Sequence, residues 1–196
     1  RLLGKPLLEA SSQHALLERA GGNPLYAEQF VELYVEQGST DELGLPETLQ
    51  GIIAARLDGL PETEKALLQD AAVVGKVFWA SAIRQDLETA TALLHSLERK
   101  GFVRRQRRSS LEGESEFAFA HALVRDVSYG QIPRAERAER HRAVAGWIDG
   151  LGRTEDHAEM LAYHWSSALE LVRAAGGSDD GLAERTRRAL RNAGDR

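Results

Sequence analysis

The stretch 89–119, TATALLHSLERKGFVRRQRRSSLEGESEFAF, changes from helical to strand periodicity partway along. Its first part carries leucines at helical spacing, and Gly101 then ends the predicted helix. Beyond that glycine, residues 102–108 and the alternation around Phe117 and Phe119 predict two strands joined by a polar turn. The stretch therefore predicts a helix followed by a β-hairpin.

Two more helices are predicted immediately upstream, at 61–74 and, as a short segment, near 80–86. Three helices followed by a hairpin is the element order of a winged helix. These elements therefore predict a winged-helix domain at the centre of the chain.

Helices are predicted on both sides of this domain, so the expected fold class is mainly α. A helix at 7–20 ends at a glycine pair, the next runs from Pro24 to about Gly38, and another from Pro46 to about Gly59. After the hairpin, helices are predicted at 122–132, 133–151, 154–171 and 181–193. Small and large apolar residues are interleaved in the last two, which favours a helical hairpin of the kind that helical repeats stack.

Composition excludes several classes of protein. The chain has 196 residues, a net charge of −5, 42% hydrophobic residues and no cysteine. Binding of nucleic acid through bulk positive charge, intrinsic disorder, disulfides and thiolate zinc sites are therefore not expected. We find no signal segment and no long apolar run, so we expect a cytoplasmic protein without membrane contact. The chain opens at Arg1 and its only methionine is Met160, so we expect a piece of a longer protein.

No catalytic or metal-binding motif is present. Gly75-Lys76 lacks the leading glycine and the following hydroxyl of a P-loop, and no G-x-S-x-G occurs. The six histidines form no H-x-x-x-H pair. We therefore expect no catalytic residue, no metal ligand and no enzymatic activity in this part of the protein.

Two charged segments have a structural and a functional interpretation. Arg104, Arg105, Arg107 and Arg108 are placed where a DNA-binding winged helix meets phosphates. A solvated edge strand whose charges block aggregation is the alternative, and we favour it because the preceding helix offers few side chains for reading bases. Charges of alternating sign at 134–142 predict an exposed helix face with ion pairs along it.

Two other positions are candidates for contact with a nucleotide. The turn of Gly22, Asn23 and Pro24 brings bare backbone and a rigid ring to a helix start, where they could lie against adenine. A glycine stop followed by an asparagine cap is the structural alternative. His121 stands between the second strand and a helix, where it could donate to a phosphate oxygen. A half-buried histidine packed against the hairpin is its alternative.

Four segments in this order resemble the C-terminal part of a STAND-class ATPase, as found in large bacterial regulators with adenylate/guanylate cyclase or LuxR-type DNA-binding domains. The segments are ERAGGNPLYAEQFVELYVEQG (18–38), LPETLQGIIAARLDGLPETEKALLQDAAVVGKVFW (45–79), FAFAHALVRDVSYGQI (117–132) and RAERHRAVAGWI (137–148). The resemblance covers most of the chain.

The resemblance implies three parts: the helical lid of an AAA+-like module at 1–59, a winged helix at 60–132, and a linker helix with TPR-like helices at 133–196. The P-loop core would lie upstream and bind ADP or ATP with Mg²⁺. Gly22-Asn23-Pro24 matches the family's G-x-P motif near adenine, and His121 matches a histidine that contacts the ADP β-phosphate in related NB-ARC ATPases. Ala122 stands where those relatives have an aspartate.

The implied function is a switch, in which the lid and winged helix sense the nucleotide and control an effector domain of the same chain, with homo-oligomerisation on activation. The parent protein would be an ATPase, with a cyclase or a transcription-regulating domain as its effector. Two alternatives remain open: a winged-helix DNA-binding module, and a scaffold whose helices from Thr154 onward bind protein partners.

Overall fold

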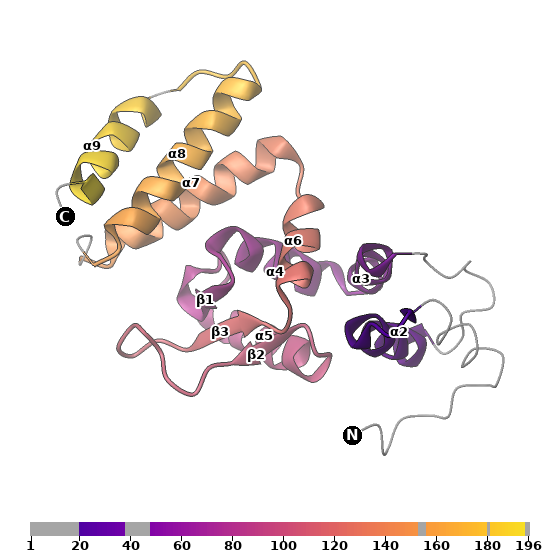
Figure 1. Ribbon diagram of the computed structural model, residues 1–196. Helices are drawn as coiled ribbons and strands as arrows, with labels where there is room; N and C mark the ends of the chain where they lie inside the picture. The colour runs from indigo at the N-terminus through magenta and orange to yellow at the C-terminus, as the bar shows by residue number, and fades with distance from the viewer. Residues whose placement is uncertain (1–19, 38–47, 153–155, 180, 195–196) are drawn as a thin grey trace. The chain divides into compact units, whose positions relative to one another are not determined.

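The computed structural model describes residues 20–37, 48–152, 156–179 and 181–194 (Figure 1). These residues form eight α-helices and one three-stranded antiparallel sheet, which confirms a mainly helical fold. The chain divides into two compact units, Arg1–Lys65 and Ala66–Arg196. In the part of the chain that the structure describes, no helix is long and apolar enough to cross a membrane.

The first unit is built on helices α2 (Pro24–Gln37) and α3 (Leu49–Asp58). Tyr26, Phe30 and Leu33 on α2 form a buried cluster with Ile52 on α3. The helix predicted at 7–20 and the Pro46 start of the next helix lie outside the described residues, apart from helical Ala20. Instead, the Thr48 side chain caps α3 by accepting a hydrogen bond from the Gly51 amide at 3.1 Å.

A buried arginine also joins the two helices of this unit. Arg56 on α3 is 1% exposed, and its guanidinium donates to Glu36 at 2.7 Å and to the Gln29 side chain on α2. A buried guanidinium needs such partners because an unpaired charge away from water is costly.

The second unit begins with helix α4 (Glu62–Val74), whose first residues belong to the first unit, and contains the sheet. The strands are β1 (Val77–Trp79), β2 (Val103–Arg105) and β3 (Glu116–Phe119), in the order β1-β3-β2. Phe78 pairs with Phe117 and Val103 with Phe119 in the registers of the two antiparallel ladders. The hairpin predicted around 102–119 is therefore present.

Strand β1 was not predicted, because three residues are too few to show an alternating pattern. Its exposed Val77 is followed by two buried aromatic residues, and the pairing with β3 stabilises it. The helix predicted near 80–86 is only a single 3₁₀ turn, η1 (Ala80–Ala82). The chain then becomes extended at Ile83. Asp86 caps helix α5 (Leu87–Arg99) by accepting from the Thr89 amide at 2.9 Å.

Four helices complete the second unit: α6 (Ala122–Gly130), α7 (Arg134–Gly150), α8 (Ala158–Ala174) and α9 (Leu182–Gly194). The last three lie side by side, with α8 between α7 and α9 (Figure 1). Trp79 at the end of β1 stacks on Trp147 of α7, with ring centroids 5.4 Å apart. The sheet and the C-terminal helices therefore share a packed core.

The prediction that residues 134–142 form an exposed helix face is wrong for Arg140, because only 6% of this residue is exposed. Its Nη1 lies 2.6 Å from Asp70 Oδ1 on α4, and its Nη2 donates to Gln69 and Glu136. The alternating charges alone could not reveal this, because the buried partner comes from a helix far away in sequence. Burial raises the pKa of Asp70, and the charges of Arg140 and Arg84 oppose that effect.

Candidate functional site

The turn before α2 is an asparagine cap with an open surface. Gly21 and Gly22 both have positive φ, at 50° and 81°, which favours glycine. The Asn23 side chain accepts from the Leu25 amide at 3.0 Å and from the Tyr26 amide at 3.4 Å. This is the geometry that an N-cap requires, so the structural role predicted for Asn23 is present.

The same turn leaves the candidate nucleotide-binding residues accessible. Gly22, Asn23 and Pro24 are all exposed, and a Cβ built on Gly22 would meet no atom within 4 Å. Pro24 therefore presents an exposed ring next to the open side of Gly22. The cap fixes the position of the ring, since it anchors the first turn of the helix directly after it.

His121 occupies the N-cap position of α6 in the second unit. Its backbone is extended, at φ −139° and ψ 142°, and its side chain makes no capping hydrogen bond. It is half-buried, as the structural alternative for this residue expects. The first turn of α6 contains no acidic residue, so the positive end of the helix dipole is not offset by a carboxylate there.

An arginine lies next to this helix start. Nη2 of Arg104, from β2, donates to the carbonyl oxygen of Ala120 at 3.1 Å, one residue before His121. Sequence reasoning placed Arg104 only in the basic segment and His121 only at a helix head. Antiparallel pairing of β2 with β3 brings them to the same corner, which we call the α6 corner, formed by Arg104, Ala120, His121 and the first turn of α6.

The remaining arginines of the basic segment are also exposed. The Arg105 amide donates to Glu98 at 2.9 Å, and its guanidinium reaches Ser115 at 3.3 Å. Arg107 and Arg108 lie in the segment after β2. Arg104 and Arg105, two of the four arginines that the alternative DNA-binding interpretation would use, thus already have side-chain partners within their own unit.

Gly22-Asn23-Pro24 and His121 belong to different compact units, and each is described within its own unit. The structure thus describes two separate local surfaces. One is a rigid exposed ring, and the other is a cationic corner at a helix start.

Sequence reasoning missed a buried histidine pair between α7 and α8. Nδ1 of His141 lies 2.9 Å from Nδ1 of His164, and both side chains are fully buried. The Tyr129 hydroxyl of α6 lies 3.0 Å from Nε2 of His141. Helical spacing could have indicated burial, since His164 lies three residues after Leu161 and four before Ala168, which are both buried.

The surroundings keep both imidazoles neutral. Burial, together with the charges of Arg125 and Arg137, lowers the pKa of His141 to about 4. Burial and the neighbouring His141 lower the pKa of His164 to about 3. A neutral pair can share one hydrogen bond, with one imidazole donating and the other accepting. The pair is therefore a packing feature at neutral pH rather than an acid–base centre.

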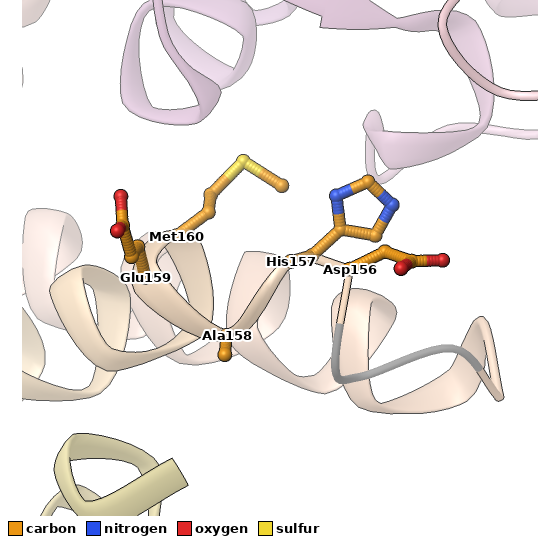
Figure 2. Close-up of a pocket in the computed structure, with 5 residues that line it drawn as sticks. All are labelled: Asp156, His157, Ala158, Glu159 and Met160. Atoms are coloured by element: carbon orange, nitrogen blue, oxygen red, sulfur yellow. The ribbon is translucent and has the colours of Figure 1, made fainter. Parts of the chain in front are cut away.

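A shallow hollow of about 380 Å³ lies at the start of α8 (Figure 2). The side chains of His157 and Met160 extend to the same side of the helix, and Ala158 points away from them. Asp156 and Glu159 complete the lining. Over the described ranges, no group of three or more metal-ligating side chains converges here or elsewhere.

Comparisons with known proteins found no relative: no family model, no curated protein and no solved structure matches this chain.

Proposed function

We propose that this chain is the regulatory part of a STAND-class ATPase. In this proposal its lid and winged helix sense ADP or ATP bound to an upstream P-loop core and control an effector domain. The proposal starts from the resemblance of four sequence segments. Three structural observations support it, of which the α6 corner carries the most weight.

The first supporting observation is the order of elements in the second unit. Helix α4, strand β1, the short helix η1, helix α5 and the hairpin β2–β3 follow one another, and the sheet order is β1-β3-β2. A winged helix has this element order and this sheet order. Helix α5 carries no asparagine or glutamine and a single arginine, Arg99, which favours a winged helix that acts as a hinge rather than as a reader of DNA.

The second observation is the α6 corner. Arg104, half-buried His121 and a helix start without acidic residues all present positive or hydrogen-bond-donating groups. Such a combination suits an anion, and a nucleotide phosphate is the anion that the resemblance implies. Ala122 departs from the aspartate of the related ATPases, so the proposed phosphate contact depends on His121, Arg104 and the helix start.

The third observation is the exposed, capped turn of Gly22-Asn23-Pro24. Its rigid, exposed ring and the open space at Gly22 among the described residues suit the face of a purine. In the proposed mechanism, ADP contacts the upstream core, the Gly22-Asn23-Pro24 turn and the α6 corner. ATP with Mg²⁺ changes the contacts at the phosphate end, releases the winged helix and allows the effector domains to assemble.

The test is the nucleotide content of the parent chain, extended upstream to include the core. We expect the wild type to retain ADP on purification and the double variant Pro24→Ala/His121→Ala to lose most of it. The matched control is Pro61→Ala/His95→Ala, which changes an exposed proline and an exposed histidine outside both surfaces. Retention of ADP by the first double variant, or absence of nucleotide from the wild type, would overturn the proposal.

Nucleic-acid binding is the second candidate function, because all four arginines of the basic segment are exposed. The net charge of −5 and the scarcity of base-reading side chains on α5 weaken it.

A further inference from the structure

A pocket lies among the three C-terminal helices, remote in sequence from both surfaces described above. It has a volume of about 130 Å³. Its polar lining consists of Asp149 from α7, Trp165 from α8, and Arg185, Arg188 and Asn192 from α9. Because α7 and α9 both pack on α8, the pocket belongs to one rigidly packed set of helices.

The guanidinium of Arg185, which lines the pocket, packs over an aromatic ring. The guanidinium carbon of Arg185 lies 5.2 Å from the centroid of the Trp165 ring, and Trp165 itself is 6% exposed. A cation over an aromatic face is attracted by the negative face of the ring. This contact restricts the arginine side chain, so less conformational entropy is lost when it binds a ligand.

The other polar groups of the pocket are available to a ligand. Within the described ranges, Arg185, Arg188 and Asp149 form no ion pair with one another or with another residue. By contrast Arg187, on the same helix but outside the pocket, pairs with Glu184 at 3.0 Å. The pocket therefore presents two guanidinium groups, one amide and one carboxylate, with a net positive charge.

Its size limits the ligand. A volume of about 130 Å³ corresponds to roughly four water molecules. That is well below the usual range for cofactor and nucleotide sites, about 300 to 1,000 Å³. A single carboxylate-bearing side chain fits, and a planar guanidinium fork matches a carboxylate in two parallel hydrogen bonds.

We propose that this pocket binds a glutamate side chain of an acidic peptide segment in a partner protein. Arg185 and Arg188 hold the carboxylate, and the contact with Trp165 keeps the Arg185 guanidinium in position. The chain as a whole has a net charge of −5 and repels acidic peptides. Binding of such a peptide would therefore report a local site and not bulk attraction.

The test uses the full chain and two fluorescein-labelled peptides, one of four glutamates and one of four glutamines, followed by anisotropy at low ionic strength. We expect the glutamate peptide to bind and the glutamine peptide not to bind. Arg185→Gln/Arg188→Gln should weaken binding at least about tenfold, as expected for losing charge-assisted hydrogen bonds. The matched control, Arg187→Gln/Arg191→Gln, removes the same charge from the same helix outside the pocket and should retain the affinity.

A second variant checks the sign of the charge effect. Asp149→Asn removes the one negative group of the pocket, so the glutamate peptide should bind more tightly. Circular dichroism of each variant confirms that the helices are intact. Any of three results would overturn the proposal. The two arginine double variants could lose equal affinity for the glutamate peptide, the wild type could bind both peptides equally, or it could fail to bind the glutamate peptide.

Discussion

The Nδ1 atoms of His141 and His164 lie 2.9 Å apart in the core between α7 and α8. The imidazole whose Nδ1 accepts the hydrogen bond cannot take up a second proton without placing two N–H groups against each other. Burial is the largest cause of the low pKa of both, about 4 for His141 and about 3 for His164. The contact therefore makes the packing of these helices sensitive to acid.

We expect the free energy of unfolding to fall as the pH is lowered from about 6.5. The folded-state pKa values lie below the unfolded value of 6.5, so the unfolded chain binds more protons throughout that range. The expected slope is about 1.4 kcal/mol per pH unit for each histidine. Urea unfolding between pH 7 and 5 measures it, above the range in which most carboxylates titrate.

His164→Gln supplies the comparison, since glutamine does not titrate. It should lower the free energy of unfolding at pH 7 and reduce its dependence on pH by about half. His95→Gln changes an exposed histidine and is the matched control, with the wild-type slope. If His164→Gln had the wild-type slope as well, the pair would not be the source of the acid sensitivity.

Arg140→Met should lower the free energy of unfolding by about 3–5 kcal/mol. The substitution removes one ion-pair partner of buried Asp70 and leaves only the more exposed Arg84. Adding Asp70→Leu should recover part of this loss, since no unpaired charge then remains. Arg142→Met, which breaks only the exposed pair with Glu139, should cost less than about 1 kcal/mol. Denaturant unfolding of these variants forms the test, and similar losses for Arg140→Met and Arg142→Met would contradict it.

The turn at Gly22-Asn23-Pro24 allows an effect on stability to be separated from an effect on the proposed nucleotide binding. Asn23→Ala removes the cap of α2 and should cost about 0.5–2 kcal/mol of stability. Pro24→Ala leaves the cap in place and should change stability little, while the extended parent chain loses ADP. Thermal unfolding and nucleotide content of the two variants are the measurements. A large stability loss from Pro24→Ala would assign that proline a structural role only.

Labelled duplex DNA should show no change in anisotropy with this chain at low salt. The net charge of −5 opposes binding, and α5 offers few side chains for reading bases. The comparison is a variant with glutamine at 104, 105, 107 and 108. Salt-dependent binding by the wild type that this variant loses would favour the DNA-binding function instead.

The sequence by itself determined the local elements of this protein. Gly101 and the alternation around Phe117 and Phe119 predicted the helix end and the hairpin, and Asn23 predicted the cap of α2. These features depend on backbone preferences and on neighbours a few residues away, which the sequence contains directly. For the same reason the mainly helical class could be predicted.

Only the tertiary structure decided which side chains meet. Strand β1 exists because β3 pairs with it, and Arg140 is buried because Asp70 on α4 faces it. The α6 corner and the histidine pair likewise join residues from separate elements. Such contacts depend on how helices and strands pack, and burial then changes the chemistry of a group, since the cost of leaving a charge unpaired rises away from water.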